Sequence, residues 1–318
     1  MKAASIVETA QGTALELREA PKPEPGPQQL LLRVKASSLN RGELLPTGKP
    51  GARPAGVEAV GEVAALGKDV KGLAEGARIM ARCKGGFAEY ALVDAGEAMA
   101  IPDRLSWEQA AAVPIVFLVG YDMLVPYGRV RRGDWVLVTA VSSGVGVASL
   151  QLAKALGAKV IGTSGSSEKL DKLRALGLDA GIATRGALAA EVMRITDQHG
   201  ADLAINNVGG SVFADLVRAA AYRGRIAIVG YVDGSLEAPI DLAAVHSKRL
   251  EIFGVSNRLR NAAERADTVA GFKRDCLSWF ADGSIQPLVD RVFDFDAIAE
   301  AKAYFDRNAH VGKVVLRL

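Results

Sequence analysis

The chain has 318 residues, of which 49% are hydrophobic and 34 are glycines, so it is long enough for two domains with separate cores. Its 39 basic and 36 acidic residues leave a net charge of only +3, which argues against a nucleic-acid-binding protein. Its two cysteines exclude a disulfide framework and a four-thiolate zinc site. No apolar run suits a signal region or a membrane span, so we expect a cytoplasmic protein.

The first third of the chain predicts a mostly β domain. Strand-like runs occur at Leu30–Val34, Val57–Val63 and Ala77–Ala81, with glycine-containing turns between them. Ser106 is followed three residues later by Gln109, which is the pattern of a capping box and therefore predicts the start of a helix.

Strands and helices alternate from Trp135 onward. The predicted strands are Trp135–Thr139, Lys159–Thr163, Ala180–Ala183, Asp202–Asn206, Arg225–Val229 and Leu250–Val255, and the predicted helices include Glu168–Leu176, Ala187–His199 and Val212–Ala221. This alternation is typical of a parallel sheet covered on both faces, with Leu250–Val255 expected at its edge. The tail ends in a strand, Lys313–Leu318, that is too short to stand alone, so we expect it to rejoin the first domain.

The turn after the first of these strands resembles a damaged dinucleotide-binding fingerprint. In G-x-G-x-x-G, the glycines allow a tight turn, close approach of the pyrophosphate and close packing of the helix on the strand. Val141 and Ser143 stand at the first two glycine positions, whereas Gly144 and Gly146 are present where the helix begins. Because backbone N–H groups at a helix start attract anions, we expect phosphate binding here. The predicted contacts are Ser142, Ser143, Gly144, Val145 and Gly146.

The end of the second strand indicates which cofactor is bound. NAD-specific sites carry an Asp or Glu about 20 residues beyond the fingerprint for the ribose hydroxyl. Thr163–Ser167 holds no acid, and Glu168 is expected in the first turn of the next helix, where acids are favoured in any case. Hydroxyl and cationic donors suit a 2′-phosphate, so we predict NADP. The predicted contacts are Ser164, Ser166, Lys169 and Arg185.

Eight segments carry a resemblance that spans essentially the whole chain. They are VKASSLNRGEL (34–44), PAGVEAVGEV (54–63), GGFAEYALV (85–93), AAAVPIVFLVGYDML (110–124), the glycine turn, INNVGG (205–210), GRIAIVGY (224–231) and HVGKVVL (310–316). In this order they resemble the medium-chain dehydrogenase/reductase superfamily, specifically its zinc-free quinone oxidoreductase branch. The resemblance implies an α/β protein. It implies that a GroES-like, mostly β catalytic domain (1–118 and 267–318) is interrupted by a Rossmann NADP-binding domain with a doubly wound parallel sheet (119–266).

The resemblance also implies roles for residues outside the glycine turn. Asn40 is expected in the active-site cleft, where its amide would donate to the acceptor oxygen, and Tyr231 is expected to border the nicotinamide. Phe117 and Val119 are expected to line the substrate pocket. Three further residues are expected at the cofactor, namely Asn207, Val208 and Gly230.

No metal site is expected. Zinc-dependent relatives have Gly-His-Glu where this chain has Gly56-Val57-Glu58, and their four-cysteine loop is missing, so Glu58 is expected to be held in a turn or an ion pair. Without zinc to polarise a carbonyl, the acceptor must be electrophilic on its own. We therefore predict NADPH-dependent reduction of a quinone or an activated C=C bond (enal or enone). No general acid is assigned, and water or a ribose hydroxyl of the cofactor is left as the proton source.

Two other functions stay open. Thr139–Gly146 nearly matches the T-G-x-x-x-G-x-G turn of short-chain carbonyl reductases, although none of the six tyrosines has the lysine four residues later that their catalytic pair requires. The other alternative is a catalytically weak protein that binds NADPH as a redox sensor or structural component. The expected partners are a small electrophilic substrate and a second copy of the chain, since pairing of Leu250–Val255 across a two-fold axis would hide an edge strand.

Overall fold

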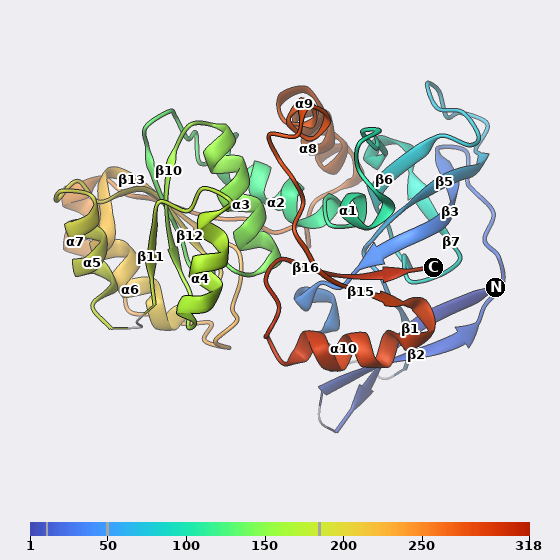
Figure 1. The fold of residues 1–318 in the computed structure, drawn as a ribbon, viewed down its shortest axis with the longest axis horizontal. Coiled ribbons are helices and arrows are strands. Elements are labelled where there is room, and N and C mark those ends of the chain that lie inside the picture. The colour runs from blue at the N-terminus through green and yellow to red at the C-terminus, as the bar shows by residue number, and fades with distance from the viewer. Residues whose placement is uncertain (11, 49–50, 184–185) are drawn as a thin grey trace. The chain divides into compact units, whose positions relative to one another are not determined.

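The computed structural model describes residues 1–10, 12–48, 51–183 and 186–318. The chain folds into two compact units: unit 1 comprises Met1–Leu118 and Asn261–Leu318, and unit 2 comprises Val119–Arg260 (Figure 1). Arg185, which was expected at the cofactor, lies outside the described residues. None of the helices in these described ranges is long and apolar enough to cross a membrane.

Unit 1 is built mainly of strands. One sheet has the order β2-β1-β4, and a larger sheet has the order β15-β16-β3-β5-β6-β8, with β7 also paired to β3. The strands are β1 (Lys2–Thr9), β2 (Gly12–Glu19), β3 (Gln29–Ser38), β4 (Arg53–Pro54), β5 (Glu58–Leu66), β6 (Arg78–Arg82), β7 (Tyr90–Asp94), β8 (Met99–Ala100), β15 (Val289–Asp294) and β16 (Lys313–Arg317). The helical segments are η1 (Arg41–Leu44), η2 (Ala95–Glu97), α1 (Trp107–Ala111), the start of α2 (Pro114–Leu124), α8 (Ala262–Asp275), α9 (Leu277–Asp282), η3 (Phe295–Ala297) and α10 (Ile298–Asp306).

The C-terminal strand β16 completes the larger sheet of unit 1. It runs parallel to β15 and antiparallel to β3, where Leu316 pairs with Ser37. Val314 and Leu316 are buried in a hydrophobic core with Ile6 and Phe87. The expectation that this short strand packs with the first part of the chain is therefore confirmed, since it gains both backbone partners and apolar cover there.

The capping box predicted near Ser106 is present. Ser106 Oγ accepts a hydrogen bond from Gln109 N at 3.2 Å, and Gln109 Oε1 accepts one from Ser106 N at 3.1 Å. These two bonds satisfy backbone donors at the start of α1 that have no partner within the helix.

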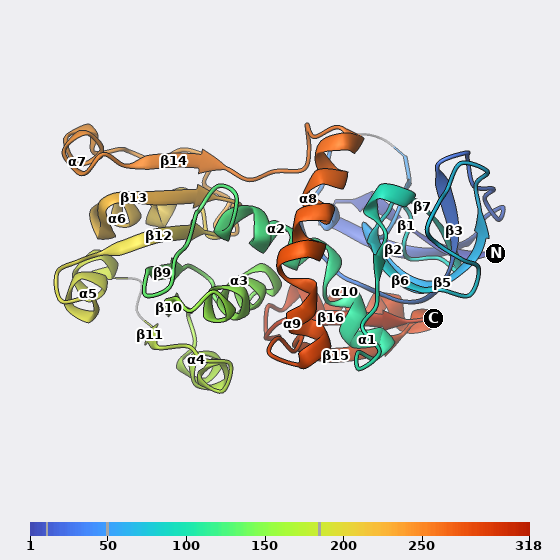
Figure 2. The same cartoon turned by 90° about the horizontal axis from the view of Figure 1, so that it is seen from above.

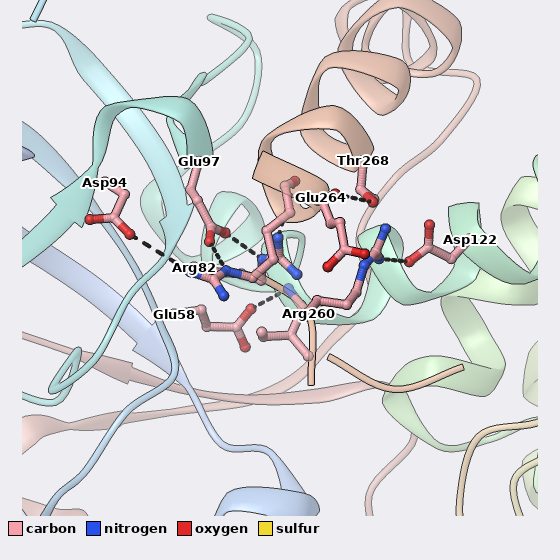
Figure 3. A network of polar contacts seen from close by, with 10 residues as sticks. Glu58, Arg82, Asp94, Glu97, Asp122, Arg260, Glu264 and Thr268 are labelled. Atoms are coloured by element: carbon pink, nitrogen blue, oxygen red, sulfur yellow. Dashed lines mark hydrogen bonds and ion pairs between the residues drawn. The ribbon is translucent and has the colours of Figure 1, made fainter. Parts of the chain in front are cut away.

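In each unit, charged side chains connect segments close to residue 260 with earlier parts of the chain. In unit 1, the Glu97 carboxylate accepts hydrogen bonds from Nε of Arg82 on β6 and from Nε of Arg265 on α8, each at 2.5 Å (Figure 3). In unit 2, the Asp122 carboxylate on α2 accepts one from Arg260 Nη1 at 2.5 Å. The contacts of Arg265 with Glu97 and of Arg260 with Asp122 therefore each tie together two segments of one unit that are far apart in the sequence.

Unit 2 contains a parallel sheet with the strand order β11-β10-β9-β12-β13-β14. Its strands are β9 (Trp135–Val138), β10 (Lys159–Thr163), β11 (Ala180–Ile182), β12 (Ala201–Asn206), β13 (Ala220–Ile228) and β14 (Glu251–Gly254), and its helices are α3 (Gly144–Ala155), α4 (Ser167–Arg174), α5 (Leu188–Ile195), α6 (Gly210–Ala219) and α7 (Leu242–Lys248). Helices α3 and α4 lie on one side of the sheet, and α5 and α6 lie on the other (Figures 1 and 2). The predicted parallel, two-sided architecture is confirmed, and β14 is at the edge as expected.

One predicted helix is shorter than expected. The pattern at Ala187–His199 suggested a continuous helix, but α5 ends at Ile195. Asp197 and Gln198 have φ angles of 51° and 66°, which a right-handed helix does not allow. Thr196 Oγ1 accepts a hydrogen bond from Gly200 N at 2.8 Å and so stabilises the turn that replaces the last helical residues.

Candidate active site

The turn between β9 and α3 accommodates Val141 at a position where the dinucleotide-binding fingerprint has glycine. The Val141 side chain is fully buried and packs over Gly162 of β10, where an added Cβ would lie 2.5 Å from Val141 Cγ1. Val141 N also donates to Thr163 O at 2.9 Å, which fastens the turn to β10. The valine is therefore accommodated by a glycine on the neighbouring strand, which makes room for its side chain.

Gly146 is needed for close packing at the start of α3. A Cβ at this position would lie 2.5 Å from the Ala140 carbonyl oxygen, so another residue would push the helix away from the turn. Ser143 is the N-cap of α3, and its Oγ accepts a hydrogen bond from Gly146 N at 3.1 Å. The first turn of a helix leaves N–H groups without intrahelical partners, and such groups bind anions. The predicted phosphate contacts Ser142, Ser143, Gly144, Val145 and Gly146 all lie in this turn or in the first turn of α3.

The loop after β10 is ordered by serine side chains. Ser166 is the N-cap of α4 and its Oγ accepts from Lys169 N, while Ser164 Oγ accepts from Ser166 N, each at 3.3 Å. A hydroxyl that accepts a hydrogen bond still has a proton to donate. Glu168 lies in the first turn of α4, as predicted, and its carboxylate is 2.8 Å from Lys172 Nζ. The acid of this segment is therefore engaged with a lysine on its own helix.

The two asparagines at the end of β12, Asn206 and Asn207, form hydrogen bonds that stabilise the neighbouring turns. Asn207 N donates to Thr139 Oγ1 at 2.9 Å, and Asn207 Nδ2 donates to Thr139 O at 2.8 Å, so the ends of β9 and β12 are tied together. Asn206 Oδ1 accepts from the backbone N–H groups of Val208 at 3.1 Å and Gly209 at 2.9 Å. Contact of Asn207 or Val208 with a cofactor stays a prediction.

The loop after β13 combines a glycine with an exposed aromatic ring. A Cβ on Gly230 would lie 2.8 Å from the Asn207 carbonyl oxygen, so glycine allows these two loops to approach. Tyr231 follows and is 52% exposed, which leaves part of its ring available to a planar ligand. Its place beside the nicotinamide stays a prediction.

Asn40 of unit 1 is held by a buried ion pair. Lys313 Nζ donates to Asn40 Oδ1 at 2.7 Å and lies 3.1 Å from Glu58 Oε1. Asn40 Nδ2 donates to Glu58 Oε1 at 2.6 Å and to the Ser38 carbonyl oxygen at 3.2 Å. Both protons of the amide are therefore in use, and the longer of the two bonds is the one to Ser38.

Glu58 begins β5 and is fully buried with both oxygens bonded. Oε1 accepts from Ser38 Oγ at 2.5 Å in addition to the contacts above, and Oε2 accepts from Ile115 N at 2.7 Å (Figure 3). A buried ion pair is stable only when such bonds offset the loss of solvation. The expectation that Glu58 is held in an ion pair is confirmed. Its partner Lys313 was not identified, although a lysine in the buried run HVGKVVL (310–316) was a usable signal.

Glu43 is a second carboxyl of this cluster, and the sequence analysis missed it. It lies on η1, three residues after Asn40, and its Oε2 accepts a hydrogen bond from Gly56 N at 3.1 Å. Burial raises the pKa of Glu43 from 4.5 to about 8, and the negative charge of Glu58 contributes to the rise. The signal available in the sequence was an acid three residues after Asn40, followed directly by the apolar residues Leu44 and Leu45.

The two residues expected to line the substrate pocket are buried. Phe117 is 2% exposed, and its ring packs edge-on against Phe280 with 4.9 Å between the ring centroids. Val119, the first residue of unit 2, is 9% exposed. Phe117 thus contributes to the core of unit 1, and the role of either residue in a substrate pocket stays a prediction.

The surroundings of Val57 do not suit a metal ion. Throughout the described ranges, no group of three or more His, Cys, Asp and Glu side chains is placed to hold one. Cys83, which lies close to Glu58 and Glu43, is half-buried, and desolvation followed by the charge of Glu58 raises the pKa of its thiol well above the ordinary value.

Comparison with known proteins defines the family. The model of the alcohol dehydrogenase GroES-like domain matches residues 26–103, and the model of the zinc-binding dehydrogenase matches residues 144–269. A solved NAD-dependent alcohol dehydrogenase is 30% identical with a TM-score of 0.85, and the match covers 100% of both chains. The chain therefore belongs to the medium-chain dehydrogenase/reductase superfamily, in its quinone oxidoreductase-like branch, with a GroES-like unit and a Rossmann-type unit.

Two further solved structures and a polyketide synthase subunit are also similar to this chain. A quinone oxidoreductase of Pseudomonas syringae is 25% identical with a TM-score of 0.85, and a mycobacterial protein solved with NADPH shares the fold at 24% identity and a TM-score of 0.90, each over 100% of both chains. A phenolphthiocerol/phthiocerol polyketide synthase subunit of Mycobacterium tuberculosis is 33% identical over 204 residues, which is 62% of this chain and 9% of the synthase. The chain thus spans about a tenth of the length of the first such relatives.

Proposed function

We propose that the protein is a zinc-independent, NADPH-dependent oxidoreductase that reduces a quinone or an activated C=C bond, such as that of an enal or enone. The observation that carries the proposal is the Asn40 amide, held between Glu58 and Lys313. Hydride addition to an electrophilic acceptor needs placement and a hydrogen-bond donor more than a Lewis acid. The Pseudomonas syringae relative, named as a quinone oxidoreductase, supports this reaction class.

Unit 2 is the proposed NADP-binding domain. When bound, the reduced nicotinamide supplies the hydride. The start of α3 would hold the pyrophosphate, and the 2′-phosphate would take donors from Ser164, Ser166 and Lys169. The mycobacterial protein solved with NADPH supports this choice, whereas the relative named as NAD-dependent is the opposing case. The absence of an acid in Thr163–Ser167 favours NADPH.

Unit 1 is the proposed catalytic domain, with Asn40 as the donor to the acceptor oxygen. The 2.6 Å bond from Asn40 to the Glu58 carboxylate is charge-assisted, so it is the stronger of the two bonds of the amide. The N–H group in the 3.2 Å bond to Ser38 is therefore the one that would instead donate a hydrogen bond to the oxygen of the substrate. Lys313 fixes Oδ1 and so keeps Nδ2 in this orientation. The bond to the acceptor strengthens as negative charge develops on its oxygen.

The test is a substrate panel. Purified protein is assayed with NADPH and NADH against quinones, enals and enones, and with NADP⁺ against simple alcohols. We expect reduction of at least one electrophilic class and little oxidation of alcohols. If simple alcohols are better substrates than every quinone and enone, the proposed reaction is wrong. Tight NADPH binding without turnover on any acceptor would instead favour the redox-sensing alternative.

A further inference from the structure

The buried cluster of unit 1 contains more acid than base. Glu43 and Glu58 are both carboxyls, and Lys313 is the ammonium in contact with Glu58. Lys313 donates its three protons to Leu39 O, Asn40 Oδ1 and Glu58 Oε1, so it makes no hydrogen bond to Glu43. A negative charge on Glu43 would therefore lack a directly bonded counter-charge in a desolvated place, which is strongly unfavourable.

The two oxygens of Glu43 differ in their contacts. Oε2 accepts from Gly56 N at 3.1 Å, whereas Oε1 is buried and has no hydrogen-bond partner among the residues that the structure describes. The carboxylate form would leave this oxygen both charged and unsolvated, while the protonated form is neutral and has an O–H group to donate. Burial, together with the charge of Glu58, raises the pKa of Glu43 to about 8, so it holds its proton at neutral pH.

Glu43 is also next to the amide that is proposed to bind the acceptor. Asn40 is the N-cap of the 3₁₀ helix η1 (Arg41–Leu44), and Glu43 is the third residue of that helix. Glu58 and Lys313, which both hydrogen-bond the Asn40 amide, are close enough to Glu43 for their charges to affect the pKa of its carboxyl. We propose that Glu43 stores and delivers the proton that the acceptor takes up after hydride addition, an inference that rests on the proposed reductase activity.

The proposed step balances for both kinds of acceptor. With an enone, hydride addition forms a C–H bond at the β-carbon, and the C=C electron pair moves into an enolate. The O–H bond of Glu43 then breaks, and its proton forms a C–H bond at the α-carbon. With a quinone, the hydride forms an O–H bond at one carbonyl oxygen and leaves the other oxygen as a phenolate, and the proton from Glu43 forms the second O–H bond there. Two electrons pass from the cofactor to the acceptor, and water returns a proton to Glu43.

Charged and titratable groups face Glu43 from several elements. Glu58 comes from β5 and Lys313 from β16, and Arg53 of β4 donates to the Glu43 carbonyl oxygen at 2.7 Å. Cys83, just after β6, has a thiol whose pKa burial raises, so it stays neutral where Glu43 titrates. A test must therefore assign the titration by removing Glu43 itself.

The experiment compares the wild type with Glu43→Gln, Glu43→Asp and a matched control, Glu62→Gln. Glu62 is also a carboxyl of unit 1, on β5, but it pairs with Arg33 at the surface. The first readout is the infrared carbonyl band of protonated carboxyl groups, recorded between about pH 6 and 10 on protein without cofactor. The second is kcat against pH with NADPH and the best acceptor from the panel.

We expect a protonated carboxyl in the wild type that ionises near pH 8, as the pKa of Glu43 implies, and its loss in Glu43→Gln but not in Glu62→Gln. The wild-type kcat should fall above this pH. Glu43→Gln should lower kcat by about 10²-fold and remove the fall, with little change in KM. Glu43→Asp should keep a pH-dependent fall at a reduced kcat, which distinguishes proton delivery from structural damage if the glutamine variant folds poorly.

The outcomes separate the two proposals. A wild type that reduces no acceptor overturns the proposed function. A wild type that turns over, with a Glu43→Gln variant that keeps the same pH profile, overturns the role of Glu43 alone. Persistence of the infrared band in Glu43→Gln likewise overturns it, because the stored proton would then belong to another group.

Discussion

Replacing Glu43 by Gln should change how the stability of unit 1 depends on pH. The carboxyl has a pKa of about 8 in the folded protein, mainly because of burial, against an ordinary value of 4.5. A raised pKa means that the stabilisation from this group is complete below pH 4.5 and is lost as the pH rises through 8. At about 1.4 kcal/mol per pH unit, the loss reaches at most about 5 kcal/mol. We expect about half of this, since an ionised carboxylate relaxes toward water and neighbouring donors.

The assay is urea unfolding of the wild type and Glu43→Gln at pH 5, 7 and 8.5. Both proteins carry Trp135→Phe, so that the fluorescence of Trp107 and Trp279 reports on unit 1. Comparison between the two proteins cancels the titration of all other groups and any fixed cost of burying an amide. The free energy of unfolding of Glu43→Gln, relative to the wild type, should rise by about 2–3 kcal/mol between pH 5 and 8.5. If the difference is the same at all three pH values, Glu43 does not hold a proton in the folded state and the reasoning is refuted.

Four further predictions concern ligands and assembly. NADPH should bind more tightly than NADH. Lys169→Glu should reverse or narrow this difference in affinity, because it places a negative charge near the 2′-phosphate. Fluorescence titration of the wild type and the variant with both cofactors tests this. Purified protein should contain no stoichiometric zinc, and elemental analysis that finds about one zinc per chain, with activity lost on chelation, would contradict this. Asn40→Ala should lower kcat/KM by about tenfold, or roughly 1.4 kcal/mol, and leave NADPH affinity unchanged. If NADPH affinity falls as much as kcat/KM, the assignment of Asn40 to the acceptor is wrong. The protein should be a homodimer paired through the edge strand β14 (Glu251–Gly254), and light scattering that shows a monomer at micromolar concentration would count against it.

Features that depend on neighbouring residues were readable from the sequence. The capping box of Ser106 and Gln109 is present, strand Lys159–Thr163 has the predicted bounds, and Glu168 lies in the first turn of its helix. Each of these follows from the propensities and hydrogen bonds of a few consecutive residues. The regular alternation of strands and helices likewise predicted the parallel sheet. The end of α5 was not predicted because the left-handed backbone angles of Asp197 and Gln198 do not change the spacing of apolar residues from which the helix was predicted.

The chemistry of the candidate site was decided by contacts between distant segments. Val141 is compatible with the cofactor turn because Gly162 on the next strand makes room for its side chain. The glycine fingerprint considers one segment alone and so does not include this compensating glycine. Glu58 and Lys313 are 255 positions apart and meet only because β16 returns to pair with β3. Whether a buried carboxyl such as Glu43 keeps its proton depends on the donors and counter-charges that the fold brings within a few ångströms, and these cannot be deduced from residue spacing.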